Sequence, residues 1–250
     1  MGKIIAIGGE EIGPLLKNGR VKPIVCDKIH REILAITGKK NPKVLFIPTA
    51  HHDSEEFIAG FEQYYKGLGA GKVTALRLIR EKPSGAEIKA KILSADAIYI
   101  NGGNTFRMMR IWRRYGVDKL LKQAYRQGIV MSGHSAGAIC WFTYGCSDSF
   151  YKKQPFRVAA LGIIDTLLCP HYDTEPVRQP ALKKMLKRTP RLAAIALDEY
   201  AAIEIIDDKY RILPAKSEAK ARRAFWKDGE YMTEEIVANE EFEELKPLLT

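Results

Sequence analysis

Short runs of apolar, often β-branched residues recur along the first half of the chain, separated by longer stretches of mixed character. Such short runs, bounded by glycine, asparagine or charged residues, are typical of buried strands. The predicted strands are 3–7, 44–48, 73–79, 97–101 and 129–132.

Apolar residues at helical spacing fill the stretches between these runs. The spacing predicts helices over 54–67 and 105–127, with a break at Gly116. A further helix, from Ala136 to Phe142, is expected after the fifth strand.

In the last third of the chain, the pattern no longer alternates between strands and helices. The run 192–197 predicts another strand, and 201–206 with 210–213, joined at Asp207-Asp208, predict an antiparallel hairpin. The acidic tail 234–244, mixed with apolar residues, is expected to form a surface helix.

Strands that alternate with helices over short connections predict a mostly parallel sheet covered by helices on both faces. We therefore expect a three-layer α/β/α fold. No internal repeat or linker interrupts the pattern, so residues 1–250 are expected to form one domain.

Glycine-rich segments follow three of the predicted strands. They are Gly8-Gly9, Asn101-Gly102-Gly103-Asn104 and Gly133-His134-Ser135-Ala136-Gly137. In parallel sheets the carboxyl ends of the strands meet at one edge, where ligands bind. The pattern therefore predicts a site at this edge.

Composition and charge narrow the class of protein. The chain has 46% hydrophobic and 28% charged residues, as in a globular protein, and no apolar run approaches the length of a membrane span. Its formal charge of +10 comes partly from clusters at 107–114, 183–188 and 216–223. Because apolar residues interleave each cluster at helical spacing, we interpret them as solvated helix faces and expect no nucleic-acid partner.

The four cysteines form no metal-binding or redox pattern and are expected to be buried thiols. No apolar run has the form of a secretory signal, so a cytoplasmic location is expected. We expect no metal and no cofactor.

Ser135 is the strongest candidate for chemistry. A serine on a sharp strand-to-helix turn, flanked by small residues, matches the nucleophile elbow of serine hydrolases. Its hydroxyl needs a base, and His171, in the loop-like 169–173 segment, is the histidine that follows it in sequence. His51 and His52 are weaker candidates for the base.

A third group should orient the histidine. Glu199, close after the predicted strand 192–197, is the first choice. Adjacent side chains at a strand end face opposite ways, so only one of Asp198 and Glu199 is expected to face the histidine, and Asp198 is the alternative.

These segments together resemble the peptidase E and cyanophycinase family of serine peptidases. The matching residues are 101–105, 133–138, Pro170-His171 and Leu197-Asp198-Glu199. The resemblance implies a fold like that of class I glutamine amidotransferases, of flavodoxin-like type. It also implies Ser135 as nucleophile, His171 as base and acid, Glu199 as orienting acid, and an oxyanion hole from the N–H groups of Gly103 and Ala136.

The resemblance further implies hydrolysis of short peptides through an acyl-enzyme, without cofactor. In the family, peptidase E members release N-terminal aspartate from dipeptides, and cyanophycinases cleave arginine-bearing aspartyl polymers. Asn104 and Arg178 are candidates for substrate binding in this chain. His134 departs from the family, which more usually has tryptophan or a small hydroxyl residue before the nucleophile. We expect a monomer or a homodimer.

Two other functions are compatible with Ser135. An α/β-hydrolase esterase shares the elbow, but its chain order is serine, acid, histidine. A non-enzymatic small-molecule binding module on the same fold would tolerate loss of the hydroxyl.

Overall fold

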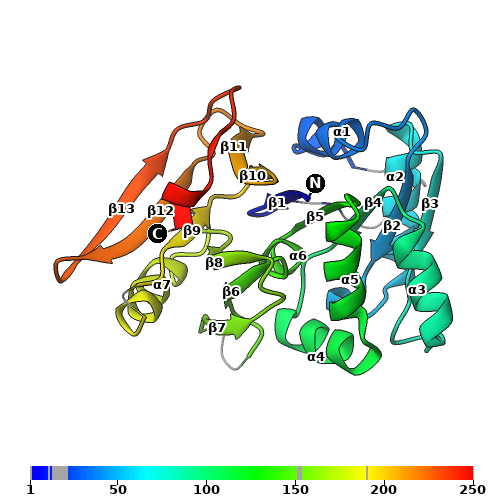
Figure 1. Ribbon diagram of the computed structural model, residues 1–250, viewed down its shortest axis with the longest axis horizontal. Helices are drawn as coiled ribbons and strands as arrows, with labels where there is room; N and C mark the ends of the chain where they lie inside the picture. The colour runs from blue at the N-terminus through cyan, green and yellow to red at the C-terminus, as the bar shows by residue number, and fades with distance from the viewer. Residues whose placement is uncertain (1, 11, 13–21, 151–153, 190, 250) are drawn as a thin grey trace.

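The five apolar runs of the first half of the chain form neighbouring parallel strands of one sheet. In the computed structural model, which describes residues 2–10, 12, 22–150, 154–189 and 191–249, these strands lie in the order β1-β5-β4-β2-β3 (Figure 1). Their bounds are β1 Lys3–Ile7, β2 Lys43–Ile47, β3 Lys72–Ala75, β4 Ala97–Ile100 and β5 Val130–His134. Beyond β1, the sheet continues antiparallel through β10 (Ala201–Ile206), β11 (Lys209–Pro214) and β14 (Glu243–Glu244).

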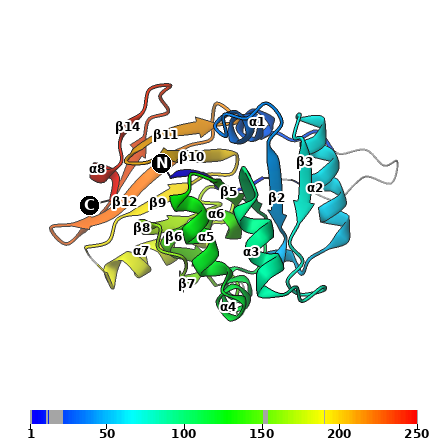
Figure 2. The ribbon, with the colours of Figure 1, turned by 45° about the vertical axis from the view of Figure 1, so that its right-hand side comes forward.

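Helices cover both faces of this sheet, because every strand of its parallel half is apolar on both sides. Ile5 and Ile7 face a core shared with α1 (Asp27–Ala35) and α2 (Glu55–Gly67). Ile4 and Ala6 face the opposite core, which contains residues of α3 (Gly85–Leu93), α4 (Thr105–Tyr115) and α5 (Val117–Arg126). Figure 2 shows α1 on one side of the strands and α3–α5 on the other. The expected three layers are therefore present around the first sheet.

A second sheet, which the sequence pattern did not predict, lies beside the first (Figure 1). Its order is β13-β12-β9-β8-β6-β7, with bounds β6 Phe142–Ser147, β7 Phe156–Ala159, β8 Ile164–Cys169, β9 Ala194–Leu197, β12 Ala221–Lys227 and β13 Glu230–Ile236. Helix α7 (Arg178–Lys187) packs its apolar side chains against this sheet. Two short helices, α6 (Ala136–Ile139) and α8 (Lys246–Leu249), and the 3₁₀ turn η1 (Thr49–His51) complete the described elements.

The α/β class is confirmed, but the sheet is not mostly parallel throughout. Parallel pairing holds from β1 to β3 and among β6, β8 and β9, whereas all other pairings are antiparallel. The chain leaves the alternating strand–helix pattern after β5, and hairpins such as β10–β11 and β12–β13 supply the antiparallel strands.

Three local predictions were wrong in extent or type. The segment 234–244 forms no helix: it contains the end of β13, a connection and β14. The third strand ends at Ala75 rather than at residue 79, because the amides of Ile79 and Arg80 donate to the buried carboxylate of Asp53. Helix α6 ends at Ile139, since Phe142 already belongs to β6.

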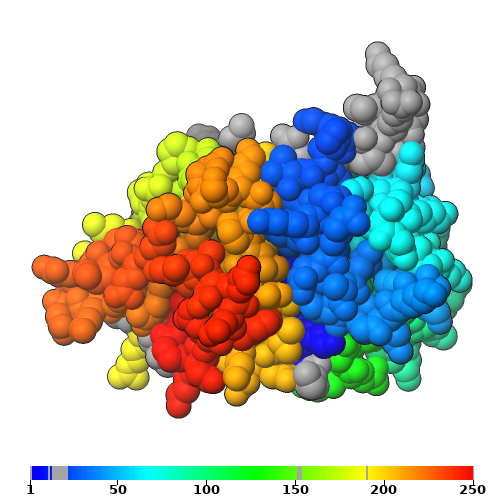
Figure 3. Space-filling view, turned by 90° about the horizontal axis from the view of Figure 1, so that it is seen from above, coloured from blue at the N-terminus to red at the C-terminus, as the bar shows by residue number. Residues whose placement is uncertain are grey.

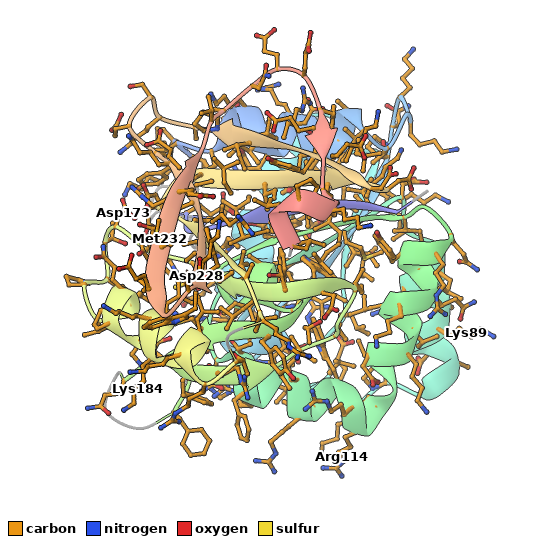
Figure 4. All side chains as sticks on the ribbon, turned by 60° about the vertical axis from the view of Figure 1, so that its left-hand side comes forward. Lys89, Arg114, Asp173, Lys184, Asp228 and Met232 are labelled. Carbon is orange, nitrogen blue, oxygen red and sulfur yellow. The ribbon has the colours of Figure 1, made fainter. Side chains whose placement is uncertain are left out.

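Basic residues lie on helix surfaces in two of the three clusters, on α4 and α7. Figure 4 shows Lys89, Arg114 and Lys184 projecting outward from α3, α4 and α7. The third cluster, 216–223, instead leads into strand β12. The β12–β13 hairpin projects at one end of the molecule (Figure 3). In the described part of the chain, no helix is long and apolar enough to cross a bilayer.

Candidate active site

A sharp strand-to-helix turn, with the candidate residue Ser135 on it, forms where β5 ends against β4. Ser135 follows β5 with φ 52° and ψ −111°, a conformation that non-glycine residues rarely adopt, and α6 begins at the next residue. A Cβ atom at Gly133 or at Gly137 would collide with the carbonyl oxygen of Ile100 in β4. The two glycines of the motif are therefore required by the close approach of the turn to the neighbouring strand.

His171 and Glu199 come from the second sheet. Strands β8 and β9 are parallel neighbours, and Pro170-His171 and Asp198-Glu199 follow their carboxyl ends. The two side chains therefore leave the sheet at the same edge. This edge meets the carboxyl edge of the first sheet at Ser135.

The three side chains form one chain of contacts. The Oγ atom of Ser135 lies 2.9 Å from Nε2 of His171, and Nδ1 of His171 lies 2.8 Å from Oε2 of Glu199. The side chains of His171 and Glu199 are 16% and 18% exposed, so the hydrogen bonds are shielded while the site stays open to a ligand. This geometry can transfer the serine proton to the imidazole.

The carboxyl group of Glu199, which contacts His171, is held ionised. The hydrogen bond from His171 lowers the pKa of Glu199, against the opposing effect of burial, and the hydroxyl of Thr174 donates to the same Oε2 at 3.0 Å. The main-chain N–H of Glu199 donates to Oδ1 of Asp173 at 2.8 Å. Asp173 and Thr174 follow His171 by two and three residues in the sequence, and this nearness was the only signal that pointed to them.

Asp198, the alternative acid, faces away from the histidine. Its carboxylate accepts hydrogen bonds from the Arg222 guanidinium at 2.6 Å and from the Lys220 amide at 3.0 Å. The structure thus brings Glu199, and not Asp198, to His171.

The glycine loop after β4 lies directly beside the nucleophile. A Cβ atom at Gly102 would lie 3.3 Å from Cβ of Ser135. Gly103 has φ 132°, and its neighbour Asn104 donates its amide to the Ala50 carbonyl at 2.9 Å. The N–H groups of Gly103 and Ala136 donate to no acceptor within the described residues, so both are available to a ligand.

Asn104 and Arg178 are engaged by the protein itself. Asn104 caps α4 by accepting from the Arg107 amide at 2.8 Å, and it donates to the Ser149 carbonyl at 2.9 Å. Arg178 is 2% exposed, and its nitrogens contact Glu175, Asp148 and the Cys146 carbonyl. Among the described residues, no hydrogen bond joins either side chain to Ser135 or His171.

The remaining histidines lie away from the nucleophile's hydroxyl. The His51 ring packs at a tilt against that of Phe57 beyond β2, and burial, with the nearby charges of His52 and Arg107, lowers the pKa of His51. All four cysteines are buried and unpaired, as expected.

Two features near the site were not predicted. A buried group formed by Glu10, His30, Tyr99 and His134 lies behind the elbow. Arg107 donates to the Ala50 carbonyl at 2.9 Å, the same oxygen that holds Asn104. His134, which precedes Ser135, is an unusual residue at this position of the motif. It was the one sequence signal that could have pointed to the buried group.

An α/β fold with a serine on an elbow, a histidine and a carboxylate in contact defines the class of serine hydrolases. Comparison with known proteins narrows this class. The chain belongs to peptidase family S51, whose family model matches residues 18–213, and it is a serine-type peptidase.

Its relatives are named accordingly. The chain is 31% identical to the uncharacterized peptidase YgaJ of Bacillus subtilis (strain 168), over 92% of this chain and 95% of the relative. It is 26% identical to a peptidase E of Citrobacter koseri, over 73% and 77% of the two chains. The fold resembles the crystal structure of a peptidase from an acI-B1 Actinobacterium, with a TM-score of 0.71, 20% identity, and coverage of 98% and 97%.

Proposed function

We propose that this chain is a serine exopeptidase that hydrolyses short peptides, dipeptides with an N-terminal aspartate among them, through an acyl-enzyme at Ser135. The observation that carries the proposal is the contact chain from Ser135 Oγ through His171 to Glu199. A peptide substrate agrees with membership of family S51.

In the first half of the reaction, Nε2 of His171 takes the Ser135 proton while Oγ bonds to the scissile carbonyl carbon. Glu199 accepts from Nδ1 and stabilises the imidazolium that forms. The N–H groups of Gly103 and Ala136 donate to the oxyanion. When the carbon–nitrogen bond breaks, the leaving amine takes the proton from Nε2, and the acyl group stays on Ser135.

In the second half, His171 takes a proton from water as the water oxygen bonds to the acyl carbon. The carbon–Oγ bond breaks, and Nε2 returns the proton to Ser135. Oγ therefore starts and ends each cycle protonated.

The chain order of the three residues favours this reaction over that of an α/β-hydrolase esterase. In that class the acid precedes the histidine, whereas Glu199 follows His171 here. A panel of acetyl esters and short peptides tests the distinction: turnover of esters with no cleavage of any peptide would contradict the proposal.

Covalent labelling tests the nucleophile. We expect a fluorophosphonate to modify Ser135, located by mass mapping of the digest, and Ser135→Ala to abolish both labelling and peptide hydrolysis. The matched control is Ser94→Ala, at an exposed serine on the C-cap of α3, which should label as the wild type does. Wild-type folded protein that acquires no adduct at Ser135 and cleaves no peptide would favour the binding-module alternative.

An acidic side-chain preference has structural support at Arg107. Its guanidinium lies beside the Ala50 carbonyl that contacts the glycine loop, its Nε is buried without a hydrogen-bond partner, and it pairs with no carboxylate among the described residues. A half-buried cation of this kind attracts a substrate carboxylate. Arg178, by contrast, is already neutralised by Glu175 and Asp148.

A dipeptide library with acidic, basic and neutral first residues tests this preference. We expect Arg107→Gln to raise KM for dipeptides with an N-terminal aspartate by about tenfold, equivalent to about 1.4 kcal/mol, and to leave neutral dipeptides unchanged. Arg110→Gln, an exposed arginine three residues along the same helix, is the control. An equal effect of both changes, or no aspartate preference in the wild type, would refute a role for Arg107 in specificity.

A further inference from the structure

Behind the nucleophile lies a buried polar cluster that the reaction described above does not use. Its members come from four different parts of the chain: Glu10 follows β1, His30 lies in α1, Tyr99 in β4, and His134 ends β5. All four are buried, at 8%, 0%, 0% and 9% exposure respectively. A carboxylate this deep must be compensated by hydrogen bonds or charge.

Contacts join these side chains without a gap. The carboxylate of Glu10 contacts Nε2 of His30 at 2.6 Å through one oxygen, and it accepts from the Tyr99 hydroxyl through the other. Nδ1 of His134 lies 2.9 Å from the same Tyr99 hydroxyl and 3.3 Å from Glu10. Tyr65, from α2, extends the cluster by its hydroxyl, 2.8 Å from Nδ1 of His30.

The far end of this cluster reaches the glycine loop. The N–H of Gly102 donates to Nε2 of His134 at 3.0 Å. A ring nitrogen that accepts a hydrogen bond carries no proton, so His134 holds its proton on Nδ1. Nδ1 then donates to Tyr99, and Tyr99 donates to Glu10. Every hydrogen in this series is directed toward the carboxylate.

Glu10 is suited to end such a series because it stays ionised. Burial opposes ionisation, but the charge of His30 and the hydrogen bonds from His30 and His134 outweigh it and lower the pKa of Glu10 to about 2. An ionised acceptor strengthens the hydrogen bonds that it receives, directly from Tyr99 and through Tyr99 from His134.

The hydrogen bond from Gly102 to His134 fixes one part of the glycine loop. Two adjacent glycines allow many backbone conformations, of which catalysis needs one. A Cβ atom at Gly102 would lie 2.7 Å from Nε2 of His134 and 3.3 Å from Cβ of Ser135, so this residue lies between the imidazole and the nucleophile. The hydrogen bond to His134 fixes one side of Gly102, and the bond from Asn104 to Ala50 fixes the other end of the loop.

We propose that His134, held by Glu10 through Tyr99, is a positioning residue that sets the Gly102-Gly103 loop so that the N–H of Gly103 is directed at the oxyanion formed on attack by Ser135. This inference rests on the proposed function for its catalytic consequence. Its structural part, the fixing of the loop, does not.

The matched test uses two amides at position 134. In His134→Gln the side-chain oxygen replaces Nε2 and can accept from Gly102, whereas in His134→Asn the oxygen replaces Nδ1 and cannot reach it. We expect His134→Asn to lower kcat about 100-fold with KM changed less than threefold, because loss of an oxyanion donor acts on the transition state. His134→Gln should recover kcat to within about tenfold of the wild type.

Tyr99→Phe tests the Tyr99–Glu10 end of the buried cluster and leaves the residues of the glycine loop unchanged. It removes the hydroxyl that joins His134 to Glu10. Like His134→Asn, it should lower kcat and leave KM nearly unchanged. Thermal unfolding checks that each variant is folded. A fall in kcat that is equal in the Asn and Gln variants, or a change confined to KM, would overturn the catalytic part of the inference.

Amide hydrogen exchange measures the loop without any substrate. In a Ser135→Ala background, exchange at residues 102–104 should be at least tenfold faster with His134→Asn than with His134→Gln. Unchanged exchange would overturn the inference whatever the kinetics show. If the exchange differs as expected but the wild type cleaves no peptide, then the proposed function fails and the positioning of the loop stands.

Discussion

Several residues of the candidate site hold backbone conformations that side chains other than glycine rarely adopt. Ser135, His171 and Tyr200, next to Glu199, have φ values of 52°, 53° and 65°. Each such residue costs of order 1–3 kcal/mol and persists only where its surroundings fix it. Here the Ser135 amide donates to Ile7 at 3.0 Å, and the Tyr200 amide donates to Gly9 at 2.9 Å. The strands around the site therefore hold the reacting groups in place before a substrate arrives.

Gly9 offers a test of this fixed geometry at a single residue. A Cβ atom there would lie 2.6 Å from Nδ1 of His171 and 2.7 Å from the carboxyl carbon of Glu199. We expect Gly9→Ala to displace this pair and to lower kcat at least 100-fold, since small misplacements of a catalytic group are costly. Gly67→Ala, where a Cβ meets open space at the end of α2, is the control and should keep full activity. Steady-state kinetics on one dipeptide decides between them.

At the scale of elements, opposite charge runs pair with each other across two strands. The basic segment that enters β12 and the acidic segment of β13 are antiparallel partners, with Arg223 opposite Glu234 and Arg222 opposite Glu235. Ion pairs join Arg223 to Glu234 at 3.3 Å and Lys220 to Glu235 at 2.6 Å. Cross-strand pairs of opposite charge favour this register. The basic residues 222–223 and the acidic residues 234–235 therefore lie opposite each other on the two strands of one hairpin and not on separate helix faces.

A double-mutant cycle on Lys220 and Glu235 measures this pairing. Both side chains are about half exposed, so we expect a coupling free energy of about 0.2–1 kcal/mol that falls as salt is added. The single changes Lys220→Gln and Glu235→Gln and their combination are compared by chemical denaturation. Coupling of zero at low salt would show that the Lys220–Glu235 ion pair does not stabilise the hairpin.

At the scale of the whole molecule, the candidate triad depends on how two sheets meet. Ser135 leaves the first sheet, whereas His171 and Glu199 leave the second. One apolar core contains residues of both sheets, among them Ile4 and Met131 of the first and Leu168 and Ile195 of the second. The packing of this shared core therefore sets the distance between Ser135 and His171.

The buried carboxylate of Glu10 joins side chains from several elements, and the stability of the protein in acid tests its contribution. Because its pKa in the folded state, about 2, lies below the ordinary value of 4.5, the unfolded chain binds more protons between these values. The contribution of Glu10 to stability is complete above about pH 4.5 and is lost as the pH falls toward 2. Glu10→Gln should therefore flatten the pH dependence of the unfolding free energy in this range, by up to about 1.4 kcal/mol per pH unit. The exposed Glu56→Gln is the control, and equal slopes for the two variants would contradict the prediction.

The sequence by itself indicated the five parallel strands of the first sheet and the tight turn that carries Ser135. Apolar runs such as 3–7 and 97–101, and the glycines around Ser135, are local signals, because strand burial and a tight turn each depend on a few neighbouring residues. Gly116, with φ 69°, divides α4 from α5 where the sequence predicted the break.

Only the tertiary structure decided which distant segments are partners. It placed β1 between β5 and β10, committed Arg178 to Asp148, and joined His30 and Tyr99 to Glu10 and His134. It also brought Glu199 rather than Asp198 to His171. The reason is physical: these contacts depend on which strands become neighbours, and strand order is set by burial summed over the whole core rather than by the residues of any one segment.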